Sequence, residues 1–157
     1  MKNYEIENAK IFGKNFSGMK FAQNGRPGKR SFCLYLEDPD IINGLIQDGI
    51  MVKEQTLDDG SESKKFVIVN VNFGSKIPPV IQMKSGKNIV RMTEDLLDEE
   101  FDHLIFEKCN LIINPGHWKY NGKEGVSLYL NKMYVTVLQD RFAQEFFDDG
   151  DPEVPYV

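Results

Sequence analysis

The sequence predicts a mainly β fold: a five-stranded OB-type barrel with extra hairpins, two short helices and an acidic C-terminal tail. Three observations lead to this prediction. Several segments of the chain carry apolar and aromatic residues in the alternating or continuous patterns of strands. Turn-forming residues separate these segments at short intervals, and only two segments have the pattern of a helix. Many short strands with irregular loops and few helices are typical of a small barrel.

The first segments predict a long, bent hairpin. Residues 9–16 have the composition of a strand, and residues 30–36 form a second strand rich in apolar and aromatic side chains. Between them, residues 24–28 are rich in glycine and other turn formers, which cannot continue a ladder. We therefore expect two strands joined by a flexible basic loop.

A helix and two strands are expected next. Asp38 is a suitable N-cap, Pro39 fits the first helical position, and Gly49 is placed to end the helix. Residues 51–55 favour a short strand. Residues 66–73 are the clearest strand, because Val and Phe alternate there with polar residues.

The remaining elements are two hairpins and a second helix. Residues 80–92 predict a small hairpin, and residues 93–103 predict a short acidic helix. Two long strands follow at residues 105–114 and 126–138. The Asn121-Gly122 dipeptide between them is a strong hairpin-turn signal.

Length and composition predict one domain over residues 1–139 and a tail over residues 140–157. A chain of 157 residues can bury a substantial core but is short for two ordinary domains. No apolar run approaches the roughly 20 residues that cross a bilayer, and the start does not resemble a signal peptide. We therefore expect a cytoplasmic protein that does not bind membranes. Cys33 and Cys109 lie in predicted strands and are expected to be buried, reduced thiols.

Charge is distributed unevenly along the chain. The net charge is −5, yet residues 10–30 contain six cations and no acidic residue. From Asp140 onward, six acidic residues accompany one arginine, so the tail accounts for the whole net charge. A basic segment and an acidic tail on one chain indicate a surface for an anionic ligand.

Cations and aromatic residues occur together in two predicted loops, residues 14–32 and 117–125. Single-stranded nucleic acid needs both, because cations neutralise phosphates and aromatic faces stack on unpaired bases. The cations predicted to contact phosphates are Lys14, Lys20, Arg26, Lys29, Arg30, Lys119, Lys123 and Lys132. The aromatic residues predicted to stack are Phe16, Phe21, Trp118, Tyr120 and Tyr134.

Each of these predictions has a structural alternative. Basic residues on a hairpin often do no more than solvate a surface, and a phenylalanine such as Phe16 is more often core than platform. Trp118 is balanced between the two roles. Tyr129 lies on a strand with two largely apolar faces, so the sequence does not assign it a side.

Catalytic and metal-binding patterns are weak. His103, His117 and the two cysteines fall at no zinc spacing. The acidic residues near position 100 resemble a solvated helix face rather than a nuclease metal cluster. No glycine-rich loop of the nucleotide-binding type is present. We expect no enzyme activity, no metal and no cofactor; a nuclease is the weakest of the alternatives.

Several motifs resemble those of small OB-fold single-stranded-DNA-binding proteins of phages and prophages, over about residues 7–138. They are residues 7–18, Arg30-Ser31-Phe32-Cys33, Asp38-Pro39, Asp48-Gly49, Val71-Asn72-Phe73, Pro78-Pro79, Asn114-Pro115-Gly116-His117-Trp118, Asn121-Gly122-Lys123 and Met133-Tyr134-Val135-Thr136. The resemblance implies sequence-independent binding and protection of single-stranded DNA in phage replication or recombination. It also implies a location in the cytoplasm of an infected or lysogenic bacterial host.

The sequence leaves open the role of the tail and the oligomeric state. The tail is either a solvated end or a docking segment for replication or recombination proteins. Its candidate docking residues are Asp148, Asp149, Asp151, Glu153 and Tyr156. A free strand edge could pair with a second copy of the chain. The strongest rival function is a protein-binding module, such as a phage inhibitor of a host factor.

Overall fold

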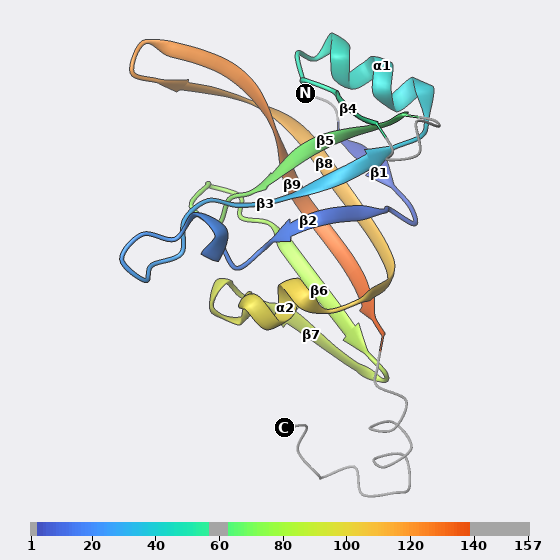
Figure 1. Cartoon of the computed structure of the whole chain (residues 1–157), viewed down its shortest axis with the longest axis vertical. Coiled ribbons are helices and arrows are strands. Elements are labelled where there is room, and N and C mark those ends of the chain that lie inside the picture. Colours follow the sequence, from blue (N-terminus) through green and yellow to red (C-terminus); the bar gives the residue numbers. More distant parts are fainter. Residues whose placement is uncertain (1–2, 57–62, 139–157) are drawn as a thin grey trace, which may run out of the picture.

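The computed structural model describes residues 3–56 and 63–138. Within them, nine strands form one mixed sheet (Figure 1). The strands are β1 (Tyr4–Ile6), β2 (Ile11–Asn15), β3 (Arg30–Leu36), β4 (Lys53–Thr56), β5 (Ser63–Val71), β6 (Val80–Ser85), β7 (Asn88–Met92), β8 (Phe106–Tyr120) and β9 (Lys123–Val137). The helices are α1 (Pro39–Gln47), α2 (Glu99–His103) and the 3-10 turns η1 (Met19–Phe21) and η2 (Glu94–Leu96).

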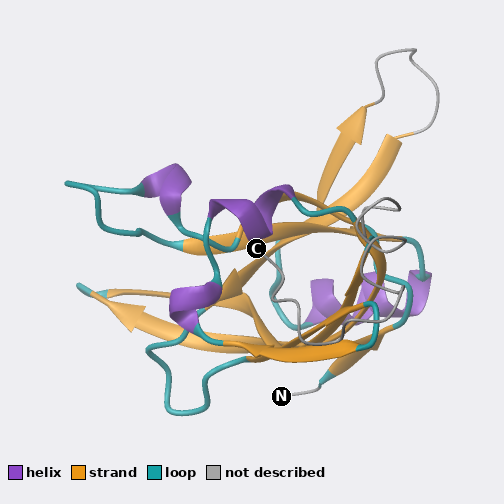
Figure 2. Ribbon diagram, turned by 90° about the horizontal axis from the view of Figure 1, so that it is seen from below, coloured by secondary structure: helices purple, strands orange, loops and turns teal. Residues whose placement is uncertain are grey.

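Five strands form the predicted OB-like barrel when β1 and β2 are taken as one bent strand. The sheet runs β1-β8-β9-β5-β3-β2, so consecutive segments of the chain form its two ends. Between them, the Ala9 N–H donates to the Cys109 carbonyl at 2.7 Å. The β5–β9 pairing is parallel, and the other pairings along this path are antiparallel. The strands therefore curve around a common centre (Figure 2).

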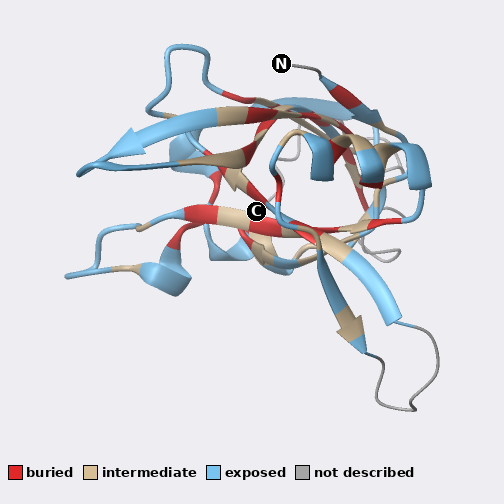
Figure 3. Ribbon diagram, turned by 90° about the horizontal axis from the view of Figure 1, so that it is seen from above, coloured by how far each residue is buried: buried red, intermediate tan, exposed pale blue. Residues whose placement is uncertain are grey.

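Inward-facing residues of these strands form the core. Phe32 and Leu34 on β3, Val67 and Val69 on β5, and Ile113 on β8 are completely buried. Alternation along each strand turns the intervening residues outward, including Asn70 on β5. Buried segments gather in the barrel, while the projecting ends of the hairpins are exposed (Figure 3).

Helix α1 confirms the helix predicted after residue 38. The Asp38 carboxylate accepts from the Asp40 N–H at 2.9 Å, which caps the first turn. Ile42 and Leu45 bury the apolar face of the helix against the core. None of the helices in the described ranges has both the length and the apolar character needed to span a membrane.

The two long strands differ from the prediction at their outer ends. Residues 115–125 were expected to form a loop, yet β8 and β9 continue their pairing as far as Tyr120 and Lys123. Asn121 and Gly122 both have positive φ, as the predicted two-residue turn requires. The hairpin therefore projects beyond the barrel as a two-stranded arm (Figure 1). Strand β1 was not predicted at all.

The basic loop at residues 16–29 is ordered by backbone hydrogen bonds between its own residues. The Gly28 N–H donates to the Gly18 carbonyl at 2.9 Å, and Gln23 and Arg26 form an isolated bridge. The predicted tail, residues 140–157, with all five candidate docking residues, lies outside the described residues. The domain boundary at residue 139 therefore stays a prediction.

Candidate nucleic-acid interface

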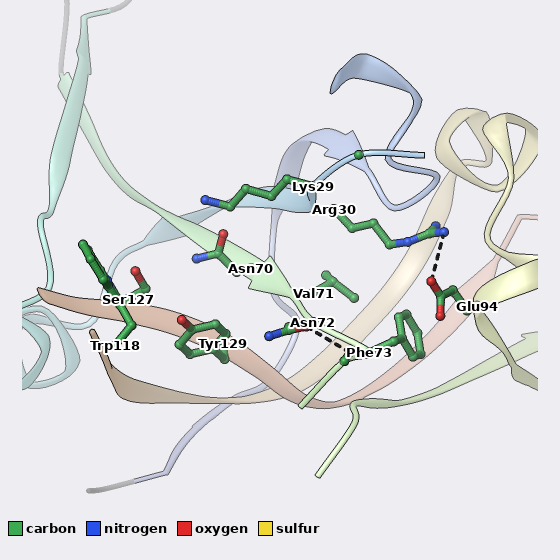
Figure 4. Close-up of a pocket in the computed structure, with 12 residues that line it drawn as sticks. Lys29, Arg30, Asn70, Val71, Asn72, Phe73, Glu94, Trp118, Ser127 and Tyr129 are labelled. Atoms are coloured by element: carbon green, nitrogen blue, oxygen red, sulfur yellow. Dashed lines mark hydrogen bonds and ion pairs between the residues drawn. The ribbon is translucent and has the colours of Figure 1, made fainter. Parts of the chain in front are cut away.

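The barrel carries a groove where three elements meet: the start of β3, the end of β5 and the β8–β9 arm. A cavity of about 500 Å³ occupies this place. Residues 28–30 line one side, residues 70–74 line the floor, and Trp118, Ser127 and Tyr129 line the other side (Figure 4). Because OB folds bind nucleic acid between the corresponding loops and strands, this groove is the candidate interface.

Two aromatic rings form one wall of the groove. Trp118, which is 38% exposed, lies opposite Gly125 across the β8–β9 ladder. A Cβ at position 125 would stand 2.7 Å from Cζ2 of the Trp118 ring. In the same way, a Cβ at Gly116 would stand 2.8 Å from Cε2 of Tyr129. Each ring thus lies close over backbone that has no side chain, which holds the ring against the arm.

Polar groups at the end of β5 and directly after it form the floor. The Asn70 side-chain N–H donates to the Leu128 carbonyl at 3.1 Å, which fixes the orientation of the amide. Its Oδ1 is buried, with no hydrogen-bond partner among the described residues. The Asn72 Oδ1 accepts from the Gly74 N–H at 3.0 Å. Hydrogen-bonding groups therefore lie beside aromatic faces in one cavity.

Lys29 provides a cation at the opposite side. Its side chain is exposed, lines the cavity and extends over the groove (Figure 4). The loop base beneath it is held in place, because Asn15 donates from Nδ2 to the Lys29 carbonyl at 3.1 Å. An exposed ammonium group beside aromatic rings is suited to contact a phosphate of a strand stacked in the groove.

Arg30 has a structural role instead of the predicted phosphate contact. It is only 9% exposed, and Nη1 donates to the carbonyls of Phe16 and Leu97. Nη2 lies 3.7 Å from Oε1 of Glu94. The guanidinium group therefore connects the loop base to the segment before α2, and its charge is already accompanied by a carboxylate.

The position of Phe16 contradicts the sequence prediction most clearly. It was predicted to stack on a base, but its ring is completely buried. The ring stacks on Phe32 at a centroid distance of 5.1 Å and meets Phe101 edge-on at 5.2 Å. Phe16 is therefore a core residue, because its position at the end of β2 points inward under α2.

Lys14 also serves the fold. Its ammonium group donates to the Leu104 carbonyl and lies 4.2 Å from the Phe106 ring centroid. Burial lowers the pKa of Lys14 from its usual range. This lysine lies between β2 and the start of β8 and does not line the groove.

Asp102 of α2 fixes the base of the basic loop. Its carboxylate accepts from the Phe16 N–H at 2.6 Å, the Ser17 N–H at 3.3 Å and the Ser17 hydroxyl at 2.6 Å. Beyond this base, Lys20, Phe21 and Arg26 are exposed, and the Phe21 ring is 53% exposed. None of these three lines the groove, so their contacts with a ligand stay a prediction.

The remaining predicted residues lie on the arm and along β9. Lys119, Tyr120 and Lys123 are exposed at the tip, where Tyr120 shares the face of Trp118. Lys132 and Tyr134 are exposed farther along β9. Of the predicted residues, the structure thus brings Lys29, Arg30 and Trp118 together at the groove.

The described residues contain no group of three or more His, Cys, Asp or Glu side chains placed to hold a metal ion. Burial raises the pKa of the Cys109 thiol to about 12. Burial also raises the pKa of the Cys33 thiol, which is half-buried on the outward face of β3. Neither thiol is activated as a nucleophile.

The fold is similar to that of the single-stranded DNA-binding protein from bacteriophage Enc34. The structure of that protein in complex with ssDNA gives a TM-score of 0.53 with 11% identity, covering 89% of each chain. Its C-terminally truncated form gives a TM-score of 0.52 with 12% identity, covering 88% of this chain and 87% of that one. No curated protein sequence shows significant similarity.

The family comparison rests on sequence and spans almost the whole chain. Residues 1–154 match the model described as a putative phage ssDNA-binding domain. This range includes the barrel, the basic loop and the arm with Trp118. The chain therefore belongs to the family of putative phage ssDNA-binding domains.

Proposed function

We propose that the chain binds single-stranded DNA without sequence preference and protects it during phage DNA replication or recombination, with no catalytic activity of its own. The observation that carries the proposal is the groove in which Trp118, Tyr129 and Lys29 meet. Family membership and the ssDNA complex of the similar Enc34 protein support the same ligand.

The absence of sequence preference follows from how the groove would hold its ligand. Stacking accepts any base, because every base has a π-face, and it contributes about 1–3 kcal/mol per base. The exposed residues that we retain as contacts are Lys20, Phe21, Arg26, Lys29, Trp118, Lys119, Tyr120, Lys123, Lys132 and Tyr134, joined by Tyr129.

The test is a titration with oligo-dT, followed by tryptophan fluorescence at low and at moderate salt. Trp118 is the single tryptophan of the chain, so the signal reports the groove alone. We expect saturable quenching that weakens with salt, since released counterions drive binding to phosphates. Absence of quenching and of a mobility shift at low salt would contradict DNA binding and favour a protein partner. Added magnesium with a labelled oligonucleotide would reveal cleavage if the protein were a nuclease.

We further propose that the acidic tail docks replication or recombination proteins in the cytoplasm of the bacterial host and competes with DNA for the basic surface. Deletion of residues 148–157 should then strengthen oligo-dT binding at low salt. Unchanged affinity would argue against competition.

A further inference from the structure

We propose that the bound strand continues beyond the groove along the outward face of β9 to a second subsite on the β6–β7 hairpin. There, Lys84, Arg91 and Lys132 lie on the same face of the sheet as the exposed ring of Tyr134. The ligand class is a single-stranded nucleic acid, held by phosphate contacts and one stacked base. This inference rests on the proposed function.

The ladder places these four side chains on one face. Along the β6–β9 pairing, Gln82 is the partner of Tyr134 and Val80 is the partner of Lys132. Along the β6–β7 pairing, Gln82 is the partner of Arg91. Residues that alternate with these, such as Met133 and Ile81, are completely buried, so the opposite face points outward.

This face is basic and has no acidic residue of its own. Residues 80–92 contain Lys84, Lys87 and Arg91, and neither they nor residues 126–137 contain Asp or Glu. Acidic residues lie across the sheet: Glu107 is exposed on β8, which pairs with β9, and Glu5 of β1 pairs with Ile112 of β8. Ile112 in turn pairs with Lys132, so Glu5 is two strand spacings, about 10 Å, from that lysine.

Tyr134 gives the basic face a stacking surface. Its side chain is 45% exposed, with Lys132 two residues away on the same strand, Lys84 on the neighbouring β6 and Arg91 one strand farther on β7. A tyrosine ring left open in such surroundings can stack on an unpaired base, while the cations neutralise the adjoining phosphates. This is the same combination that the groove presents at Trp118 and Lys29.

A second cavity extends from the groove along β9 as far as Asn131, the residue before Lys132. It has a volume of about 410 Å³ and shares Asn72 and Tyr129 with the groove. Its other side reaches Asn131 and the exposed Lys76 and Ile77 of the β5–β6 connection. From Gly125, opposite Trp118, to Tyr134 the strand covers nine residue steps, about 30 Å. A strand of several nucleotides could therefore follow β9 without leaving the surface.

The test compares two lengths of oligo-dT, about five and about sixteen nucleotides, chosen to bracket the range of OB-domain sites. The variant is Lys84→Gln/Arg91→Gln, with both substitutions at exposed positions. We expect unchanged affinity for the short oligonucleotide and at least threefold weaker binding of the long one. The log–log salt slope for the long one should become shallower by about 1.4, which is two single-strand phosphate contacts.

The matched control is Lys10→Gln/Lys65→Gln, which removes the same charge elsewhere. Lys10 lies 3.6 Å from Glu37, and Lys65 pairs with Glu54 across the β4–β5 ladder. Equal affinity and equal salt slope of the two double variants on the long oligonucleotide would overturn the second subsite. Failure of the unaltered protein to bind either length would instead overturn the proposed function. Thermal melting of each variant confirms that the fold is intact.

Discussion

The Trp118 ring lies directly over Gly125, its partner across the β8–β9 ladder. A similar contact recurs closer to the barrel, where the Tyr129 ring lies over Gly116, the ladder partner of Ser127. Gly125 and Gly116 thus determine the positions of the two rings that line one side of the groove. Residues 117–124 of the arm are exposed, so the Trp118 ring is held by the backbone beneath it, whereas Tyr129 is half-buried where the arm meets the barrel.

Substitution Gly125→Ala should displace the Trp118 ring, since a Cβ would lie 2.7 Å from Cζ2. We expect a shift in the tryptophan emission of the free protein and a loss of up to about 1–3 kcal/mol in oligo-dT binding. Gly116→Ala is the matched variant: it should move Tyr129, weaken binding and leave the emission of Trp118 unchanged. Shifted emission with unaltered affinity would show that the ring position does not matter for binding.

Phe16→Ala should lower the stability of the protein, whereas Tyr129→Ala should weaken DNA binding. Phe16 is completely buried, so its truncation should lower the free energy of unfolding by about 3–5 kcal/mol. Tyr129 is half-buried on the groove wall, and its truncation should weaken oligo-dT binding by about 1–3 kcal/mol with little effect on stability. Denaturant unfolding and oligonucleotide titration of both variants distinguish these roles. A stable Phe16→Ala protein with weak DNA binding would restore the stacking role of Phe16.

Much of the fold was predictable because its elements carry local patterns. The Asp38 cap, the Asn121-Gly122 turn and the valine alternation of β5 each determine one element without help from the rest of the chain. Strand β1 has only three residues, which is too short for a local pattern. It is a strand because it pairs with β8, and the local sequence does not show that pairing. Residues 115–120 contain Pro and Gly, which favour a loop locally, but the long β8–β9 ladder keeps them paired.

The site was predictable only in part. Trp118 and Lys29 could be found because cations and aromatic residues gather in loops that an OB barrel places side by side. Phe16 and Arg30 have the right residue types, but their burial depends on α2 and η2, which approach from far along the chain. The sequence does not assign Tyr129 to a face of its strand, because both faces are largely apolar. The nearby Gly116 is the one sequence feature that indicates room for the Tyr129 ring.

The two thiols should differ in reactivity. Cys109 is buried with a pKa raised to about 12, whereas Cys33 is half-buried on the outward face of β3. At pH 8 we expect one thiol per native chain to react slowly with a thiol reagent, and both to react after unfolding. Cys33→Ser should abolish the native reaction. Native labelling of Cys109 would show that the contact between Ala9 and Cys109 opens readily.

Asp102→Asn should loosen the base of the basic loop. Asparagine has one acceptor oxygen, so it cannot accept from the Phe16 N–H and from the two donors of Ser17 at once, as the two carboxylate oxygens do. Hydrogen bonds to charged groups contribute about 1.5–3 kcal/mol, so we expect a loss of stability in that range, measured by denaturant unfolding. Glu100→Gln on the same helix is the control, since it removes the same charge from an exposed position. Equal stability of the two variants would contradict the role of Asp102.

Lys29→Gln and Lys14→Gln should separate a cation of the groove from a cation of the fold. Lys29 is exposed over the groove, so its loss should make the log–log salt slope of oligo-dT binding shallower by about 0.7. Lys14 is engaged with the Leu104 carbonyl and the Phe106 ring, so its loss should leave the slope unchanged and lower the melting temperature instead. Both variants change the net charge equally, which removes long-range electrostatics as an explanation for any difference between them. Equal slopes for the two variants would mean that Lys29 does not contact a phosphate, and the cations of the arm and of the loop tip would then have to neutralise the strand.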